Sequence, residues 1–558
     1  MCGIWALANL TSNKGDVVSW FKDFMEIVHR GPDNSYFETY QNVMIGFHRL
    51  AIMDDTFSSN QPFILEDDKR TIVFICNGEI YNFRELIEQY NLPDSKNDCM
   101  TIPELYMKLL KANRIYDFPS IVRNSVKGEF AFVLFEFDRL KNLKKVVACR
   151  DEIGIRPLYV SQKEDILFFT SELKGALSYK HSMLEFPPGI MQIYDINELG
   201  HCVSHKLSCS LLQDMKVIDD LPAIERLNIV RKEVMKSVRR RLASDKPLAF
   251  LLSGGVDSSL VAALSAKMLG KPIRTFCCGM QEGTDLQYAR MVAKHIGSNH
   301  TEVFFTPQEG LDAIRDVIRT TETWDTTTIR ASVGQYLVCK WIGTQTDCKV
   351  VMVGEGPDEV CSSYLFNWYA PSGDALDKAA KDYVANIHYY DVKRADRCIA
   401  RWGLEGRVPL LDPDFIRAYW SIPAEQRMPT YKNMEKWWLR EAFAGTGILP
   451  DAVLWRKKEA FSDGVSGEKS WFQIIQEWVD PQVSDEEMAG AALTYPYCSP
   501  TTKEAFLYRK IFCEIFGSHR QEIIPGYWQP KWSSNGQEVV GYIDPSARVL
   551  GVYSQSAV

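Results

Sequence analysis

The second residue of the chain has the chemistry of a nucleophile that carries its own base. Cys2 follows Met1 directly, so removal of Met1 would leave a thiol and a free α-amine on one residue. An α-amino group titrates at about 7.7–8.0, well below lysine. Near neutral pH it can therefore accept the thiol proton, as in N-terminal-nucleophile enzymes. The alternative is an ordinary cysteine at a frayed chain end.

The segment LLSGGVDSSL at residues 251–260 has the residue types of a phosphate-binding loop. Glycines allow backbone N–H groups to approach an anion, and the start of the following helix adds a favourable dipole. The hydroxyl groups of Ser253, Ser258 and Ser259 add donors. The segment is not a Walker A loop, because no Gly-Lys-Ser/Thr follows. A glycine-rich turn is the alternative, but SGGVDS resembles the PP-loop of ATP pyrophosphatases, which cleave ATP to AMP and pyrophosphate.

The first part of the chain contains six ordered segments that resemble the class II glutamine amidotransferase domain. They extend over about 175 residues, so chance agreement in this order is a poor explanation. The resemblance implies that Cys2 hydrolyses glutamine through a thioester. The segments are MCGIWA, HRGPD (29–33), FHRLAIMD (47–54), CNGEIYN (76–82), RDEIGIRPLY (150–159) and TSELKG (170–175).

The residues matched by this resemblance suit the three polar groups of glutamine. Arg49 offers a fork of donors to the carboxylate, and Glu79 and Asp98 offer negative charge to the ammonium. The side chain of Asn77 and the backbone N–H of Gly78 are matched to the oxyanion, where a missing donor typically costs about 10²–10³ in rate. The stretch expected to hold the substrate backbone is Arg49, Leu50, Ala51, Ile52 and Met53. Taken singly, Arg49 could equally form a surface ion pair and NGE a hairpin turn.

The second half of the chain resembles glutamine-hydrolysing asparagine synthetases, and the similarity is closest to the eukaryotic type. It implies that aspartate attacks the α-phosphorus of Mg-ATP, giving β-aspartyl-AMP and pyrophosphate. Ammonia from glutamine then travels inside the protein and displaces AMP, because ammonia that escaped to water would mostly become protonated. The matching segments are TFCCGM (275–280), HIGSNH (295–300), TTIRASVGQYL (327–337), GEGPDE (354–359), GLEGRVPLLD (403–412), MEKWWLRE (434–441) and KEAFSDGV (458–465).

The resemblance assigns the nucleotide to two groups of residues. Pyrophosphate is expected on the loop formed by Ser253, Gly254, Gly255, Asp257 and Ser258. The adenosine pocket is expected at Leu252, Cys278, Val353 and Gly354. Asp257 and Asp358 are the expected Mg²⁺ ligands, because Mg²⁺ prefers a few carboxylates together with phosphate oxygens.

Further matched residues are expected to act on the reacting groups. Glu355 is the candidate general base of the adenylate and ammonia chemistry. Lys436 and Lys458 are expected to neutralise phosphate charge in the transition state. Arg397, Glu405 and Arg407 are expected to order the aspartate side. For each of these residues the alternative is a surface charge or a structural ion pair.

Several positions depart from the family pattern. Met100 stands where a carboxylate usually follows the residue matching Asp98. Val353 replaces a serine, and Pro357 removes a backbone N–H and fixes φ. The segment Cys361–Tyr369 also lacks the family's glycine before the tyrosine and its Phe-His-Lys after it.

These departures leave other functions open. One alternative is a glutaminase whose synthetase half is impaired or amidates another carboxylate, and a further one is a scaffold. Against these, Cys2, Arg49, Asn77, Asp257 and Glu355 are all retained. A β-lactam synthetase is disfavoured, since such enzymes lack a working N-terminal cysteine. A pure binding protein is least favoured, because binding requires no such cysteine beside SGGVDS.

Residue patterns predict two different architectures. The first part of the chain is predicted to form an α+β layered sandwich of the N-terminal-nucleophile amidotransferase type. The prediction depends on short strands rich in β-branched and aromatic residues at 3–8, 43–53, 71–77, 129–137, 145–151 and 166–172, and on helices near 16–28, 83–90 and 101–112. From about 220, strands alternate with helices, which predicts an α/β parallel-sheet PP-loop ATP pyrophosphatase-type domain with a helical C-terminal part. We expect a glutaminase domain at 2–210 and a synthetase domain at 211–558.

Composition excludes several classes of protein. The 558 residues are 46% hydrophobic and 24% charged, which is typical of a globular protein. The net charge is −8, so the chain has no excess of basic residues that would indicate binding to nucleic acid or to an anionic membrane. No apolar stretch approaches the length of a membrane span. The N-terminus has no signal-peptide pattern, so the 14 cysteines are expected to be reduced and the protein cytoplasmic. Its partners are expected to be glutamine, aspartate and ATP, with a homodimer as the family-level expectation. The spacing of His201, Cys202, His205 and Cys209 fits no common zinc pattern.

Overall fold

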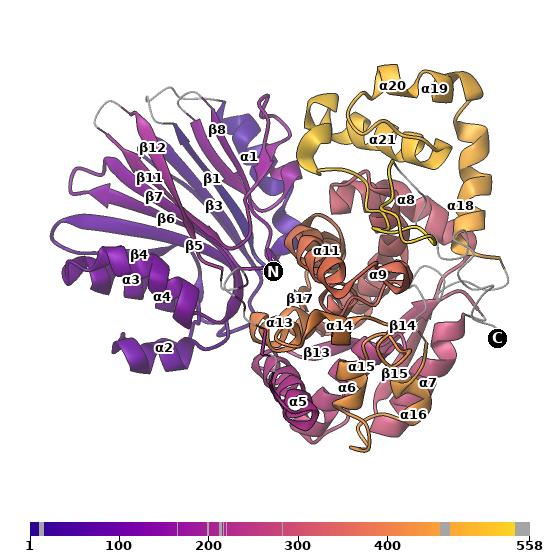
Figure 1. Cartoon of the computed structure of the whole chain (residues 1–558). Helices are drawn as coiled ribbons and strands as arrows, with labels where there is room; N and C mark the ends of the chain where they lie inside the picture. The colour runs from indigo at the N-terminus through magenta and orange to yellow at the C-terminus, as the bar shows by residue number, and fades with distance from the viewer. Residues whose placement is uncertain are drawn as a thin grey trace. The chain divides into compact units, whose positions relative to one another are not determined.

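The computed structural model describes residues 1–9, 16–163, 166–197, 200–210, 212, 215, 217–218, 220–281, 283–457 and 469–541. The chain divides into two compact units (Figure 1). Unit 1 comprises Met1–Gln213, Ala243–Lys246 and Ala400–Glu405, and unit 2 comprises Asp214–Leu242, Pro247–Ile399 and Gly406–Val558.

The described part of unit 1 contains two six-stranded antiparallel sheets. Their strand orders are β10-β8-β9-β1-β3-β2 and β12-β11-β7-β6-β5-β4. Alternate residues of β1 and β5, including Ile4, Ala6, Val73 and Ile75, meet in one buried cluster between the sheets. The strands are β1 Gly3–Asn9, β2 Asn34–Tyr40, β3 Val43–Arg49, β4 Phe63–Glu66, β5 Arg70–Ile80, β6 Gly128–Asp138, β7 Leu143–Arg150, β8 Tyr159–Lys163, β9 Ile166–Thr170, β10 Leu184–Glu185, β11 Ile190–Ile196 and β12 Cys202–Ser208.

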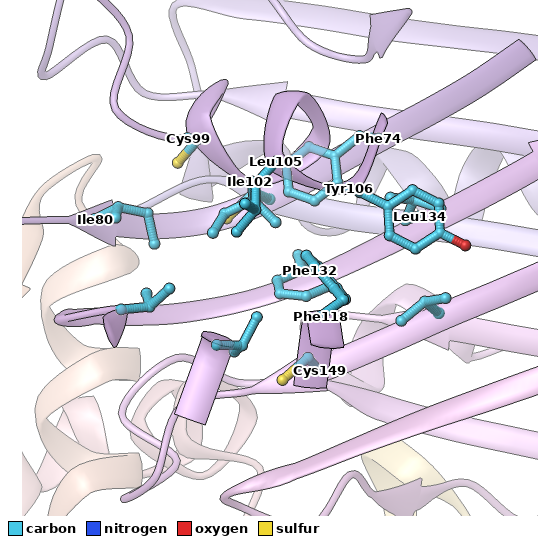
Figure 2. Packing of buried hydrophobic residues seen from close by; sticks show 14 of the residues in the cluster. Phe74, Ile80, Cys99, Ile102, Leu105, Tyr106, Phe118, Phe132, Leu134 and Cys149 are labelled. Carbon is cyan, nitrogen blue, oxygen red and sulfur yellow. The ribbon is translucent and has the colours of Figure 1, made fainter. Parts of the chain in front are cut away.

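Helices form the outer layers of unit 1. Figure 2 shows Ile102, Leu105 and Tyr106 of α3 lying over Phe74 and Phe132 of the second sheet, within one buried cluster. On the first sheet, the ring of Trp5 contacts α1 through Phe24, with 6.4 Å between ring centroids. These layers confirm the predicted α+β sandwich. The helices are α1 Val17–Met25, α2 Phe83–Tyr90, α3 Thr101–Lys111 and α4 Phe118–Ser125.

The strand expected at 43–53 is too long, because β3 ends at Arg49. The following residues turn away from the sheet, and the backbone N–H of Ala51 donates to Asp33 Oδ2 at 2.9 Å. The strands predicted from sequence do not include β2, β4, β8, β10 and β11. Of these, β2, β4 and β10 lie at the edges of their sheets. His201, Cys202 and His205 lie on or beside β12, where Cys202–Ser208 pairs with β11.

Unit 2 is built on a five-stranded sheet, of order β15-β14-β13-β16-β17 among the described residues. The pairs β13–β14, β13–β16 and β14–β15 are parallel. The strands are β13 Leu248–Leu251, β14 Arg274–Gly279, β15 Asn299–Phe304, β16 Val350–Met352 and β17 Glu405–Arg407. Helix α5 Ala223–Arg240 precedes β13, and the helices that follow are α6 Val256–Leu269, α7 Thr284–Ile296, α8 Pro307–Thr321 and α9 Thr326–Gln345. The predicted α/β parallel-sheet domain is therefore confirmed.

The rest of unit 2 is mainly helical, as predicted. Phe366, Trp528 and Trp532 form a buried, mainly aromatic cluster with Leu376 of α11. Along the described residues, no helix combines the length and apolarity that crossing a membrane requires. The helices are α10 Pro357–Val360, α11 Gly373–Asn386, α12 Asp391–Ala400, α13 Pro413–Trp420, α14 Ala424–Arg427, α15 Trp437–Glu441, α16 Asp451–Leu454, α18 Trp471–Val479, α19 Asp485–Ala489, α20 Ala491–Thr494 and α21 Lys503–Phe516.

Candidate active sites

Cys2 is held at the start of β1 by a buried arginine. Arg30 donates from Nε to the Cys2 carbonyl at 2.9 Å, and its Nη1 lies 2.6 Å from Oε1 of Glu172. The thiol of Cys2 faces the carbonyl of Leu50, with 3.8 Å between sulfur and oxygen. The fold therefore places the predicted nucleophile beside the Arg49–Met53 stretch.

Burial changes the acid–base properties of the N-terminus. It raises the pKa of the Cys2 thiol to about 11. It also lowers the pKa of the Met1 amine to about 6, although the carboxylate of Glu405, 3.8 Å away, acts in the opposite direction. An amine in this environment is neutral at pH 7 and can accept a proton. The thiol, by contrast, needs a base to become a thiolate.

Asn77 and Gly78 lie next to each other on β5 in a closely packed sheet. The Asn77 side chain is fully buried, and neither its Nδ2 nor its Oδ1 has a hydrogen-bond partner in the described parts of the chain. A Cβ on Gly78 would lie 2.3 Å from the carbonyl oxygen of Glu129, so only glycine fits there. An unsatisfied buried amide beside a glycine N–H is a suitable donor pair for an oxyanion.

Arg49 holds the loop that follows β3. Its Nη1 donates to the Thr56 carbonyl at 3.1 Å and to Oδ1 of Asn60 at 2.6 Å, and its Nη2 donates to the Asp54 carbonyl. Leu50, Ala51, Ile52 and Met53 form the irregular segment between this guanidinium and the loop. The predicted carboxylate-binding arginine is thus buried, and it orders the loop around it through its donors.

Asp98 and Cys99 connect the turn before α3 to β5. Oδ2 of Asp98 accepts the backbone N–H of Ile80 at 2.6 Å, and burial raises the pKa of this carboxyl to about 6. The Cys99 thiol lies 3.3 Å from the Gly78 carbonyl and 3.5 Å from Asp98 Oδ2. Sequence reasoning selected Asp98 and the buried Glu79 but missed Cys99, because a thiol offers no motif signal for a positioning role.

The predicted phosphate loop lines a cavity of about 290 Å³ in unit 2. Ser253 and Ser258 hold the loop together through their hydroxyls, 3.0 Å apart. Gly254 has φ 77°, and a Cβ there would lie 2.4 Å from Cβ of Tyr288. Helix α6 follows without a side-chain cap, so its first N–H groups are available to an anion. Other predicted nucleotide residues in the lining are Leu252, Gly255, Asp257, Cys278, Val353 and Gly354.

A lysine lies between the two predicted metal ligands. Lys436 Nζ is 2.5 Å from Asp257 Oδ2 and 2.7 Å from Asp358 Oδ1. Burial lowers the pKa of Lys436, but attraction to both carboxylates outweighs it and raises that pKa above its usual value. Oδ1 of Asp257 is buried and has no hydrogen-bond partner among the residues described here. Two carboxylates with an unused oxygen fit a hard divalent cation such as Mg²⁺.

Glu355 and Arg394 form a charged pair in another part of the cavity wall. Arg394 Nη2 is 3.4 Å from Glu355 Oε1 and 2.8 Å from Asp391 Oδ1. Burial raises the pKa of Glu355, and the charge of Arg394 partly opposes this. Nε of Arg394 is buried and unpaired in the part of the chain that is described. Sequence reasoning missed Arg394 and Asp391, although both lie in the run DVKRADR at the start of α12.

The residues predicted for the aspartate side do not line this cavity. Arg397 is buried against Asp396 at 2.7 Å, and Arg407 donates to the Arg241 carbonyl at 2.8 Å. Glu405 lies near the Met1 amine. The structure therefore does not bring these three together with Glu355 and Lys436. Lys458 lies outside the described residues.

The departures from the family pattern are accommodated locally. Pro357 is the first residue of α10, a position where a helix needs no N–H donor. The Ser363 hydroxyl donates to Asp358 Oδ1 at 2.5 Å. Phe366 packs into the aromatic cluster with Trp528, with ring centroids 6.1 Å apart. Pro357, Ser363 and Phe366 thus each have a defined place in the fold.

Comparison with known proteins gives matches to both halves of the chain. The family model described as Asparagine synthase matches residues 229–377 and 369–543, and the Glutamine amidotransferase domain matches residues 1–215. The chain belongs to the asparagine synthase family. Curated relatives named asparagine synthetase [glutamine-hydrolyzing] match with complete coverage of both chains. They are 38% identical over 584 residues (Gallus gallus), 39% over 587 (Cricetulus griseus) and 38% over 586 (Homo sapiens).

Each of the two candidate sites falls within one of the two family matches. The amidotransferase match contains Cys2, Asn77 and Asp98, and the synthase match contains Asp257 and Glu355. A chain with only one functional half would need only one of these groups. Both sets of residues have been retained together with the folds that position them.

Proposed function

We propose that this protein makes asparagine from aspartate, with ATP as the energy source and glutamine as the nitrogen donor. The products are asparagine, glutamate, AMP and pyrophosphate. The observation that carries the proposal is the presence, in one chain, of two sets of residues. One is Cys2, whose thiol faces the Leu50 carbonyl, with a buried Asn77 amide that has no hydrogen-bond partner among the described residues. The other is a phosphate-loop cavity lined by Asp257, Lys436 and Asp358. Family membership supports the same assignment.

In the proposed glutaminase reaction, Cys2 acts once Met1 has been removed. Its amine takes the thiol proton, and the thiolate attacks the glutamine side-chain amide. Asn77 Nδ2 and the Gly78 N–H donate to the resulting oxyanion. Arg49 binds the substrate carboxylate, and Asp98 and Glu79 bind its ammonium. The protonated amine returns its proton to the leaving nitrogen, and the C–N bond breaks as the oxyanion collapses, so that ammonia departs and a thioester remains. Water then hydrolyses the thioester and releases glutamate.

In the proposed adenylation, the Ser253–Ser258 loop and the start of α6 bind the β- and γ-phosphates. Leu252, Cys278, Val353 and Gly354 surround the adenosine. Asp257 and Asp358 would hold Mg²⁺, which when bound neutralises phosphate charge. Lys436 contributes a second cation at the same place, and Lys458 is proposed for a similar role.

The acceptor side of the proposed reaction is assigned to the wall around Glu355. Nε of Arg394 is a buried donor with no partner among the described residues, and it suits the aspartate α-carboxylate, while Asp391 offers negative charge to the ammonium of aspartate. Glu355 accepts a proton from ammonia as the amide forms. Arg397 and Arg407 support these elements from within the fold and do not contact substrate.

The proposal extends to organisation and location. Residues 2–210 form the glutaminase domain and residues 211–558 the synthetase domain. The enzyme acts in the cytoplasm as a homodimer, with small molecules as substrates and neither nucleic acid nor membrane as partner. Gel filtration with light scattering at several protein concentrations tests the dimer.

The experiment that tests the function uses protein with a native, untagged N-terminus, supplied with ATP, Mg²⁺, aspartate and glutamine. Asparagine, glutamate, AMP and pyrophosphate are measured together. We expect asparagine and AMP in equal amounts. Cys2→Ala should abolish synthesis from glutamine and retain synthesis from ammonium chloride, while Asp257→Asn should stop AMP formation and retain glutaminase activity. Glutamate without asparagine or AMP would refute the proposal and favour a diverged synthetase half.

A further inference from the structure

Gln335 is a buried polar residue in the wall of the unit 2 cavity that the proposed mechanism does not use. It lies on α9 and is 3% exposed. Its Nε2 donates to Glu355 Oε1 at 3.3 Å. Its Oε1 is buried and has no hydrogen-bond partner within the described ranges. Native proteins rarely leave such an acceptor unpaired, so this oxygen requires an explanation.

The missing partner must be a hydrogen-bond donor. A carboxylate only accepts, so the amide nitrogen faces Glu355 and the amide oxygen remains as a free acceptor. A neutral amide oxygen suits a neutral N–H donor, whereas the charged ammonium of aspartate is better matched by the full charge of Asp391. The molecule that donates to Gln335 must also reach Glu355, because the carboxylate of Glu355 lies next to the Gln335 amide and supplies a second acceptor.

We propose that Oε1 of Gln335 and the carboxylate of Glu355 together bind the ammonia that attacks the acyl adenylate. This inference rests on the proposed function. The nitrogen lone pair forms the C–N bond to the β-carbonyl carbon, and the C–O bond to AMP breaks with its electron pair leaving on the phosphate oxygen. One N–H proton passes to Glu355. Gln335 accepts a second N–H, which fixes the direction of the lone pair.

The test uses the full chain with ammonium chloride as the nitrogen source, so the glutaminase half is not involved. Gln335→Met removes the amide and retains an unbranched side chain of similar length. Loss of one hydrogen bond to ammonia should raise the apparent KM for ammonium about five- to tenfold. The KM values for ATP and aspartate should stay within about twofold, as should aspartate-dependent pyrophosphate release without ammonium.

Gln476→Met is the matched control. Gln476 Nε2 donates to Glu504 Oε2 at 2.5 Å, so the same kind of amide–carboxylate pair is removed where neither residue lines the cavity. All three KM values should be unchanged in this variant. If Gln335→Met does not fold, Gln335→Leu is measured in the same way, with the same expected rise.

Three outcomes would overturn the inference. One is an unchanged KM for ammonium in the Gln335 variants. The second is a rise for ATP alone, which would assign Gln335 to the nucleoside, and the third is a rise for aspartate, which would assign it to the acceptor. Failure of the proposed function is seen separately, because the wild-type protein would then release no aspartate-dependent pyrophosphate, and the inference would fall with it.

Discussion

Lys436 places its ammonium nitrogen 2.5 Å from Oδ2 of Asp257, although the two residues are 179 positions apart in the sequence. The same nitrogen also contacts Asp358 at 2.7 Å. Lys436 adopts a left-handed backbone conformation with φ 56°, which is strained for a residue with a side chain. In this state the lysine is the cation that neutralises both proposed metal ligands. Mg²⁺ must therefore share these carboxylates with Lys436 or displace it.

Lys436→Met should make the protein more dependent on Mg²⁺ for stability. Without the lysine, the carboxylates of Asp257 and Asp358 lose the ammonium that lies between them, which should lower the free energy of unfolding by about 1–2 kcal/mol after allowance for their partial exposure. Mg²⁺ alone should then raise the melting temperature more in the variant than in the wild type. Thermal melting with and without Mg²⁺ measures this difference. Equal Mg²⁺ shifts in both proteins would contradict the shared-ligand interpretation, and Lys510→Met, at an exposed ion pair, is the control.

The pH dependence of glutamine hydrolysis should reflect the buried N-terminus. Burial lowers the pKa of the Met1 amine to about 6, and the processed amine of Cys2 should be lowered in the same direction. The amine acts as a base only when neutral, so activity is present above its pKa and lost as the pH falls through it. The acid limb of kcat/KM for glutamine should lie below the ordinary value of about 7.7. A midpoint at or above that value would rule out the burial effect, and a protein that retains Met1 should be inactive.

Local motifs were sufficient to select candidate residues whose proposed roles depend on their immediate neighbours. Cys2, Asn77 and the Ser253–Ser258 loop could be selected from sequence, because their chemistry lies in one short segment and its flanking strand. The aspartate side could not be selected in this way. Arg394 and Arg397 are three residues apart on α12, yet Arg394 lines the cavity and Arg397 pairs with Asp396. Only the packing around the helix determines which of the two arginines faces the cavity.

The same limitation applies to contacts between distant segments. No sequence pattern connects Gln335 with Glu355 or Lys436 with Asp257, because these pairs form only after the sheet and its helices have assembled. Edge strands such as β2 were also missed. Its residues are half-buried or exposed, so hydrophobic alternation is weak there. The central strands, by contrast, were found from their nearly continuous apolar residues.

Asp98→Asn should weaken glutamine binding and, at alkaline pH, raise the free energy of unfolding. Burial raises the folded-state pKa of Asp98 to about 6, above its unfolded value, so the folded protein binds an extra proton between about pH 4 and 6. The wild type therefore loses stability as the pH rises through this window. Asparagine avoids that loss and can still accept the Ile80 N–H. At pH 8 the variant should be more stable by up to about 2 kcal/mol, while its KM for glutamine increases.

Denaturant unfolding of both proteins at pH 4.5 and pH 8 measures the Asp98 effect, with glutaminase kinetics on the same samples. The two proteins should differ least at the acidic pH, where Asp98 is largely protonated. A stability difference that does not change with pH would show that Asp98 does not titrate in this window. An unchanged KM for glutamine would remove Asp98 from the ammonium site.

Arg394 and Arg397 should respond differently to the same substitution. Arg394→Met removes the cation proposed to bind the aspartate α-carboxylate, so the KM for aspartate should rise about 10- to 100-fold, with the KM for ATP little changed. Arg397→Met removes a buried cation that contacts the carboxylates of Asp396 and Glu322, so it should lower the melting temperature instead. Aspartate-dependent pyrophosphate release and thermal melting are measured for both variants. If Arg397→Met raises the KM for aspartate while the protein stays as stable as the wild type, the sequence-based assignment is right and Arg394 is not the acceptor arginine.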